Sequence, residues 1–285
     1  MIKENARAKI NLTLDILGVR EDGYHKLSTI MQTIALADDL ELKKSSGIIL
    51  KMDASKIKGG EKISVDEKNL AWRAAVEFQK FCGKDLGVEI SLIKKIPVAA
   101  GLAGGSTDAA AVIRGMNRLY ELNLTERELC TIGERVGSDV PFCIIGGTCL
   151  AEGRGEFLTK LAPMKNFSVV LAKPDGEIST AWAYKTYDEN PAEVHPPNAE
   201  IIAQLKRGEY DAAFKNFSNV FEAVAIKKIP AVAELKNKML TAGAKVALMS
   251  GSGATVFALT DEQDVEKISA SVADSGAQIF ITKIF

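Results

Sequence analysis

The chain has 285 residues, of which 36 are basic and 37 acidic, so its formal net charge is −1. This length suits two domains or one large one, and a hydrophobic content of 47% is enough for a sizeable core. The balanced charge argues against nucleic acid as the main partner, because proteins that bind nucleic acid carry a basic excess.

The first hundred residues predict strands and one helix. Apolar and polar residues alternate from Ala8 to Gly18, which is typical of a half-buried strand. A turn is expected over residues 20–23. Further strands are predicted over residues 28–35, 39–43 and 87–94, and a helix over 69–81.

A glycine-rich segment follows the strand that ends at Lys94. It runs from Pro97 through three glycines to two hydroxyl residues. A helix is predicted next, because apolar residues recur with the period of 3.6 that gives one buried face. These residues are Ala109, Val112, Ile113, Met116, Leu119 and Tyr120. Either Ser106 or Thr107 is expected to cap this helix, with Asp108 in its first turn.

This segment suits a bound phosphate, most simply one of a nucleotide triphosphate. The first turn of a helix has N–H groups without intrahelical partners and a partial positive charge, and glycines let a phosphate approach the backbone. The segment lacks the Lys-Ser or Lys-Thr of a Walker A loop, and its spacing differs from the dinucleotide fingerprint. A tight strand-to-helix turn made of small residues is the alternative.

The second half of the chain mixes helices and short strands. A capping box at Thr125–Glu128 opens one helix, and a second unit is expected from about residue 160. Strands are predicted over 148–151, 167–172, 246–249, 256–260 and 278–285, and helices over 216–225, 230–241 and 264–274. Because the early strands resemble hairpins, the pattern favours an α+β fold over a purely parallel sheet.

Several polar positions outside the glycine-rich segment are candidates for chemistry, and each has an ordinary explanation. Lys9 lies on the polar face of the first strand, where lysine is usually solvated. Asp139 follows a helix end, where aspartate often forms a cap or turn. Asn11 and His25 have similar explanations, and residues 250–255 could form a hairpin turn. Phosphoryl transfer needs a phosphate cradle, a metal ligand, a base and a cation. The spacing of these residues in the sequence does not show that they meet in the fold.

The four cysteines form no C-x-x-C pair, which disfavours a zinc or redox site. Reduced, buried thiols are therefore expected, as in a cytoplasmic protein. The first residues lack the apolar core of a secretory signal, and no apolar run approaches the roughly 18 residues that span a membrane.

Several motifs together resemble the GHMP kinase superfamily. Residues 97–110 resemble its second motif and residues 250–255 its third. Three further stretches are similar to those members that act on a cytidine-diphosphate-linked substrate: Ala8–Leu12, Gly18–Leu27 with its Asp-Gly-Tyr-His, and Gly137–Phe142. The resemblance therefore extends over the whole chain.

The resemblance implies a two-domain α+β fold. Residues 1–160 would form the N-terminal ATP-binding domain, ribosomal protein S5 domain 2-like, and residues 161–285 a ferredoxin-like α/β domain that closes over the substrate. The implied reaction is ATP-dependent phosphorylation of the 2-hydroxyl of 4-diphosphocytidyl-2-C-methyl-D-erythritol, with Mg²⁺, in isoprenoid biosynthesis. The implied partner is this small molecule, with no nucleic acid or membrane, for a monomer or homodimer.

The resemblance also implies roles for single residues. Asp139 would accept the proton of the attacking hydroxyl, and Lys9 would keep Asp139 ionised and help to orient that hydroxyl. ATP would contact Asn69, Pro97, Gly101, Leu102, Ala103, Gly104, Gly105, Ser106 and Thr107, with Asn69 at the adenine. The substrate would contact Asn11, Tyr24, His25, Thr180 and Tyr184, with His25 bonded to the cytosine and the two tyrosines stacked on it.

The chain departs from the superfamily pattern in the glycine-rich segment. Ala103 stands where many relatives carry glycine, which suggests that a negative φ is tolerated there. Thr107 keeps a hydroxyl, and either Ser106 or Thr107 is expected to contact the metal. Asp108 would repel ATP if it pointed inward, so we expect it to face away or to be offset by Mg²⁺. No carboxylate is marked by the sequence as a second metal ligand.

Two other functions are compatible with the same motifs. One is another kinase of the superfamily, of the homoserine or mevalonate type, although Tyr24 and His25 disfavour substrates that carry no base. The other is a non-catalytic nucleotide-binding regulator, which would have no need for both Lys9 and Asp139.

Overall fold

Residues 1–285 are described here from a computed structural model, in which the chain forms two compact units. Unit 1 comprises residues 1–8, 36–98 and 103–146, and unit 2 comprises residues 9–35, 99–102 and 147–285. Strands β1 (Ile2–Asn11) and β3 (His25–Lys44) have residues in both units. The predicted division at residue 160 assumed continuous domains, and it stays a prediction.

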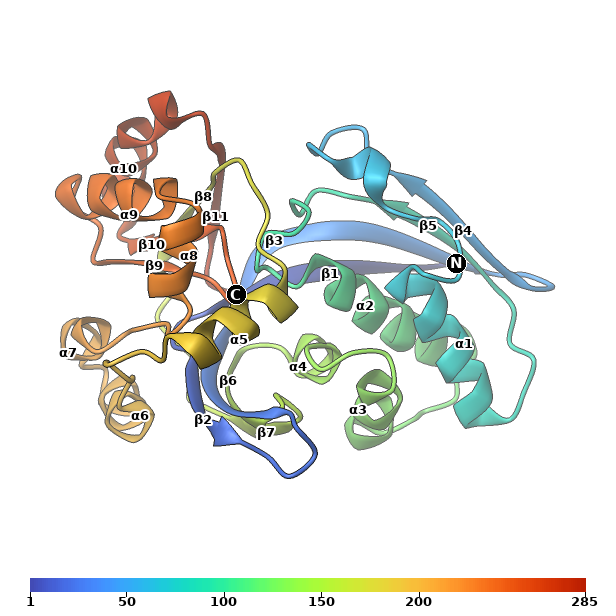
Figure 1. The fold of residues 1–285 in the computed structure, drawn as a ribbon. Coiled ribbons are helices and arrows are strands. Elements are labelled where there is room, and N and C mark those ends of the chain that lie inside the picture. The colour runs from blue at the N-terminus through green and yellow to red at the C-terminus, as the bar shows by residue number, and fades with distance from the viewer. The chain divides into compact units, whose positions relative to one another are not determined.

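Unit 1 places four helices against a small sheet (Figure 1). Strand β4 (Ile48–Asp53) pairs parallel with β5 (Val88–Ile93), and β5 pairs antiparallel with the last six residues of β3. A 3-10 turn spans Gly60–Lys62. The helices are α1 (Leu70–Cys82), α2 (Gly104–Leu119), α3 (Glu126–Glu134) and α4 (Val140–Ile145). Their apolar faces and the strands share one core, in which Phe78, Ile90 and Met116 are fully buried.

Local signals set the ends of two of these helices. Asn69 caps α1 by accepting the N–H of Ala71 at 2.9 Å, and Gly83 ends it in the left-handed region with φ 61°. The predicted capping box of α3 is present, with Thr125 and Glu128 bonding to each other's backbone N–H groups.

Unit 2 is built on an antiparallel four-stranded sheet covered by helices (Figure 1). The strand order is β11 (Gln278–Lys283), β8 (Ser168–Lys173), β10 (Val256–Thr260) and β9 (Val246–Met249). The helices are α5 (Thr180–Glu189), α6 (Asn198–Arg207), α7 (Tyr210–Lys215), α8 (Glu222–Lys228), α9 (Ala231–Thr241) and α10 (Val265–Ser271), with 3-10 turns at Glu262–Asp264 and Ala273–Ser275. Helix α9 packs on β9 and β10, and α10 packs on β8 and β11.

Unit 2 also contains the first part of β3 with its neighbours. Strands β2 (Asp15–Val19) and β6 (Thr148–Gly153) each pair antiparallel with it, and β7 (Phe157–Lys160) pairs with β6. The β2–β3 pair is the hairpin that the early strands indicated. The whole is a mixed fold with antiparallel and parallel pairs, and the predicted α+β class is confirmed.

Most predicted elements are present, with three informative differences. The single strand predicted over 8–18 is interrupted, because Leu14 leaves the sheet to bridge Asn219. The two strands predicted over 28–35 and 39–43 are one continuous β3. Residues 216–221 are not helical, since the Asn219 side chain bonds the carbonyls of Met249 and Gly251, each at 2.8 Å.

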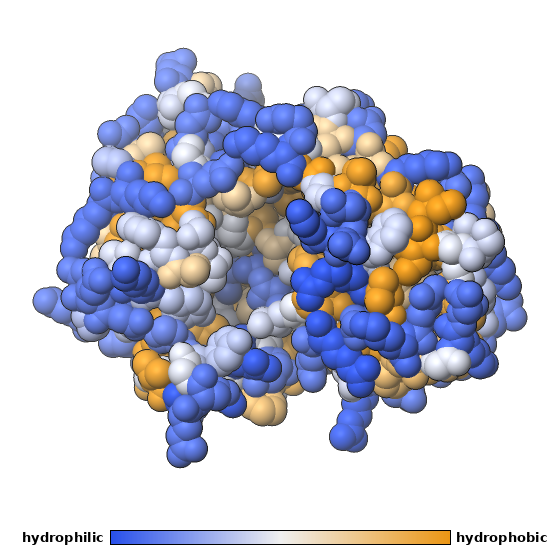
Figure 2. All heavy atoms as spheres, turned by 45° about the vertical axis from the view of Figure 1, so that its right-hand side comes forward, coloured by the Kyte–Doolittle hydropathy of each residue, from blue (hydrophilic) through white to orange (hydrophobic).

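The face drawn in Figure 2 is mostly hydrophilic, with hydrophobic areas between hydrophilic side chains, most extensive on the right of the view. The exposed apolar side chains of unit 1 include Ile49, Val65 and Ile93. None of the helices combines the length and the apolar content that a membrane crossing requires.

Candidate active site

Helix α2 begins inside the glycine-rich segment. Its first residue is Gly104, and Ala103 precedes it in the left-handed region with φ 59°. The predicted cap was wrong, because Ser106 and Thr107 lie within the helix, where the Thr107 hydroxyl donates to the Gly104 carbonyl at 2.9 Å. The predicted negative φ of Ala103 was also wrong: the chain enters α2 through a sharp turn that alanine adopts at an energetic cost.

The start of α2 has the features of an anion site. The first hydrogen bond of the α2 ladder runs from the N–H of Thr107 to the carbonyl of Ala103, at 2.9 Å. The N–H groups of Gly104, Gly105 and Ser106 come before it and have no acceptor within the helix. Gly105 is exposed and Ser106 is half-buried. Together with the helix dipole, these N–H groups suit phosphate oxygens.

In unit 2, residues 99–102 pack on the loop that joins β9 and β10. The Ser250 hydroxyl donates to the Gly101 carbonyl at 2.9 Å and accepts the N–H of Asn11 at 3.2 Å. A Cβ on Gly101 would lie 2.1 Å from the Ser250 carbonyl oxygen, and its φ is +72°, so this position requires glycine. The motifs at 97–110 and 250–255 therefore touch each other at Gly101.

Lys9 is buried rather than solvated, with 4% of its surface exposed. Its ammonium donates to Asn11 Oδ1 at 2.6 Å, and Asn11 Nδ2 donates to Thr29 Oγ1 at 2.8 Å. The alternation of β1 suggested an exposed polar face, but this end of the strand is buried on both faces. A buried lysine needs polar partners, and Asn11 is one of them here.

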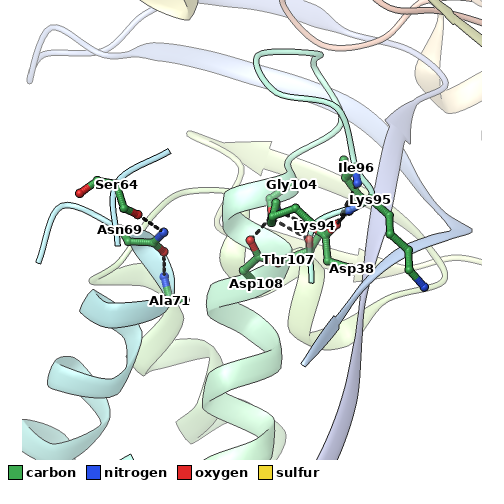
Figure 3. Close-up of polar contacts among 10 residues, drawn as sticks. All are labelled: Asp38, Ser64, Asn69, Ala71, Lys94, Lys95, Ile96, Gly104, Thr107 and Asp108. Carbon is green, nitrogen blue, oxygen red and sulfur yellow. Dashed lines mark hydrogen bonds and ion pairs between the residues drawn. The ribbon is translucent and has the colours of Figure 1, made fainter. Parts of the chain in front are cut away.

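An ion cluster of Asp38, Lys94 and Asp108 lies buried beside the start of α2 (Figure 3). Lys94 Nζ donates to Asp108 Oδ2 at 2.6 Å and also to Asp38 Oδ2. Asp38 Oδ1 accepts the N–H of Ile96 at 2.8 Å and the N–H of Lys95. The cluster thus ties β3, the segment after β5 and α2 together. The cluster was not predicted, although Lys94, unlike Lys95, continues the buried alternation of Val88, Ile90 and Leu92.

The charges in this cluster are unequal, with two carboxyl groups around one ammonium. Burial, opposed by Lys94 and reinforced by Asp38, raises the pKa of Asp108 well above its ordinary value. Burial works against the charge of Lys94, but Asp108 and Asp38 together raise the pKa of Lys94. Asp108 Oδ1 is buried without a hydrogen-bond partner. Asp108 is therefore offset by Lys94 and does not point out toward solvent.

We expect Asp108→Asn to change how stability depends on pH. Because folded Asp108 keeps its proton to a higher pH than the unfolded chain does, the free energy of unfolding falls as pH rises between those two pKa values. Asparagine has no proton to lose, so the variant becomes more stable relative to the wild type across that window. Urea unfolding at a series of pH values from 4 upward measures the difference, and a difference independent of pH would contradict it.

Asp139 immediately precedes α4. Its carbonyl accepts the N–H of Cys143 at 3.1 Å, while its side chain makes no hydrogen bond that caps the helix. The residue is half-buried. The capping explanation therefore does not account for the carboxylate.

Asn69 uses both ends of its side chain inside unit 1 (Figure 3). Its oxygen caps α1, and its Nδ2 donates to the Ser64 carbonyl at 2.7 Å. The predicted adenine contact of Asn69 stays a prediction.

In unit 2, His25 at the start of β3 meets helix α5. Its imidazole stacks on the Tyr184 ring, with centroids 4.5 Å apart and planes 23° apart, and its Nε2 lies 2.7 Å from Asp188 Oδ1. Tyr24 is exposed, with the Arg154 guanidinium 5.0 Å from its ring centroid. The structure thus brings His25 and Tyr184 together, and it adds Asp188, which was not predicted from the sequence.

Thr180, the first residue of α5, reaches the loop between β9 and β10. Its hydroxyl lies 3.2 Å from the Ser252 hydroxyl. This contact connects one predicted substrate residue to the third glycine motif within unit 2.

A bound Mg²⁺ would find few protein ligands. The structure has no group of three His, Cys, Asp or Glu residues arranged to hold a metal. The Thr107 hydroxyl is buried and already donates to Gly104, whereas Ser106 is half-buried in the first turn of α2. Mg²⁺ commonly keeps several waters and binds one or two protein groups plus substrate phosphates, so this sparse set fits the ion.

Comparison with known proteins gives the family. The GHMP kinases N terminal domain matches residues 69–147, and the GHMP kinases C terminal domain matches residues 200–278. A curated relative from Acetivibrio thermocellus is 43% identical over 263 residues, covering 92% of this chain and 91% of its own length. This chain belongs to the GHMP kinases. That relative is named 4-diphosphocytidyl-2-C-methyl-D-erythritol kinase.

Other relatives of this GHMP kinase agree. A protein of the same name from Exiguobacterium sibiricum is 46% identical over 259 residues, covering 91% of this chain and 89% of its own. A crystal structure of 4-(cytidine 5'-diphospho)-2C-methyl-D-erythritol kinase has a TM-score of 0.82 and 30% identity, with 99% of each chain covered. A homoserine kinase from Cytophaga hutchinsonii has a TM-score of 0.77 at 21% identity, covering 99% of this chain and 94% of its own, and shares the fold.

Proposed function

We propose that this protein transfers the γ-phosphoryl group of ATP to the 2-hydroxyl of 4-diphosphocytidyl-2-C-methyl-D-erythritol, a step toward isoprenoid precursors. The observation that carries the proposal is the near-complete match, at 43% identity over 92% of the chain, to a curated kinase of that name. The glycine motifs at 97–110 and 250–255 support it, because they touch at Gly101 and each lies within one of the two matched GHMP kinase domains.

We propose Asp139 as the general base and Lys9 as its partner. Asp139 takes the proton of the 2-hydroxyl as that oxygen attacks the γ-phosphorus and the bond to ADP breaks. A cation near a carboxylate favours the charged, proton-accepting form, which is the role proposed for Lys9. Phosphoryl transfer depends chiefly on positioning and electrostatics, so a well-aimed carboxylate is sufficient.

ATP is proposed to bind along the glycine-rich segment. The N–H groups at the start of α2, from Gly104 to Ser106, would bond phosphate oxygens, and Asn69 would lie at the adenine. Mg²⁺, when bound, neutralises phosphate charge, and Ser106 is the protein group best placed to hold it, since the Thr107 hydroxyl donates within the helix.

The cytidine part of the substrate is proposed to bind in unit 2. His25 would hydrogen-bond the cytosine, and Tyr24 and Tyr184 would stack on its faces. Asn11 and Thr180 would contact the rest of the molecule. The pairing of His25 with Tyr184 supports this assignment, because it places a polar edge and an aromatic face together.

The first test is ADP release from ATP and Mg²⁺ in the presence and absence of 4-diphosphocytidyl-2-C-methyl-D-erythritol. We expect release that depends on this compound and is inhibited by CMP, since CMP shares the cytidine. Release with homoserine or mevalonate instead would assign a different substrate. A protein that binds ATP but releases no ADP with any of these compounds would be a non-catalytic nucleotide-binding regulator.

A further inference from the structure

Helix α5 presents two residues, one turn apart, to the imidazole of His25. Tyr184 and Asp188 are four residues apart and therefore share one face of the helix. Tyr184 covers the face of the imidazole, while Asp188 Oδ1 lies 2.7 Å from its Nε2. The His25 side chain is 14% exposed and that of Asp188 51%. The ring is thus fixed in plane and rotation by side chains of a single helix.

The hydrogen bond to Asp188 determines where the ring carries its proton. A carboxylate only accepts hydrogen bonds, so the Nε2 of His25 is the donor. In the neutral imidazole the other nitrogen, Nδ1, then bears a lone pair and is an acceptor. Without Asp188 the two tautomers would compete, and Nδ1 would spend part of its time as a donor.

We propose that Asp188 is a positioning residue that sets the base specificity of the site by holding His25 in the tautomer with the proton on Nε2. The proposal rests on the proposed function, in which His25 bonds the cytosine. The Nδ1 acceptor is complementary to the exocyclic amine of cytosine, which donates. Uracil has a carbonyl oxygen at the same position, so two acceptors would face each other.

The stacked rings add a geometric reason. A base that bonds Nδ1 edge to edge lies near the plane of the imidazole, and that plane is 23° from the plane of Tyr184. A base held in that plane is therefore close to parallel to the Tyr184 ring, which is the relative orientation that stacking requires. Asp188 would hold the imidazole edge at the rotation that this orientation needs.

The test compares cytidine and uridine forms of the substrate by kcat/KM. The wild type should prefer the cytidine form, and Asp188→Ala should reduce that preference by roughly three- to tenfold, up to the equivalent of one hydrogen bond. Asp188→Asn should retain most of it, because the asparagine carbonyl still accepts from Nε2. Glu189→Ala removes the same charge from the adjacent, exposed position and should leave the preference unchanged.

The tautomer itself is read by ¹⁵N NMR of the ring nitrogens in labelled protein. The chain has two histidines, and the second, His195, lies with its Nδ1 2.6 Å from Asp15 Oδ1. We therefore expect opposite tautomers at the two rings, with His195 as an internal reference. In Asp188→Ala the His25 signals should shift toward a mixture while those of His195 stay in place.

Three outcomes overturn the inference. A wild-type His25 that carries its proton on Nδ1 excludes it. So does an Asp188→Ala enzyme that keeps the full preference for the cytidine form. An enzyme that phosphorylates neither form would overturn the proposed function and the specificity role with it, and the NMR spectra would show separately whether Asp188 controls the tautomer.

Discussion

Asp139→Asn is expected to lower kcat by about 100-fold or more while both KM values stay within a few fold. Asparagine keeps the shape of the side chain but accepts a proton far more weakly, so an interaction made in the transition state is lost. Asparagine has the same number of side-chain heavy atoms as aspartate, so the variant should fold. Steady-state kinetics with both substrates varied, beside circular dichroism spectra of each variant, measure this.

Glu134→Gln is the matched control for that experiment. Glu134 is the exposed last residue of α3, five positions before Asp139, and its substitution makes the same change of charge. Its kcat should equal that of the wild type. An Asp139→Asn enzyme with unchanged kcat would remove the general-base role from this residue.

Lys94→Met is expected to lower the free energy of unfolding by about 3–5 kcal/mol, the usual cost of breaking a buried ion pair by removing one partner. The substitution leaves the buried carboxyl groups of Asp38 and Asp108 without their cation. Methionine is similar in length, so the loss reflects charge rather than a cavity. Urea unfolding of wild type and variant at the same pH gives the difference.

The neighbouring lysine is the control for this prediction. Lys95 pairs with Asp39 at 2.6 Å, but their side chains are 47% and 42% exposed, so Lys95→Met should cost less than about 1 kcal/mol. If Lys94→Met is not recovered as folded protein, Lys94→Arg decides, because it retains the cation and should fold. Equal stabilities of the Lys94→Met and Lys95→Met variants would show that the cluster contributes no more than a surface pair.

Apolar periodicity and local capping signals predicted the elements that are determined by residues close in sequence. The buried face of α2 and the capping box of α3 follow from apolar spacing and from side chains that bond nearby backbone, and both are present in the structure. The adjacent strands β9 and β10 begin and end at the predicted residues. These features depend on residues close in sequence.

Features that depend on distant partners were not predicted. Lys94 continues the buried face of β5, but its carboxylate partners Asp38 and Asp108 come from β3 and α2. Residues 216–221 have helical spacing, but the bonds of Asn219 to the β9–β10 connection decide their conformation. The role of Asp188 depends on His25, which lies 163 positions earlier in the chain.

The contact between Asn11 and Ser250 has a consequence for how the chain folds. It joins residues 239 positions apart, and Gln32 likewise bonds the carbonyl of Phe285 at the end of the chain. Contacts so distant in sequence form slowly, because a long loop must close before they contribute. During synthesis every residue of unit 1 is available once position 146 has emerged, whereas unit 2 lacks its last strand until position 283 has emerged. The surroundings of Lys9 are therefore among the last parts of the molecule to form, and a nascent chain can hold a folded first unit well before this site exists.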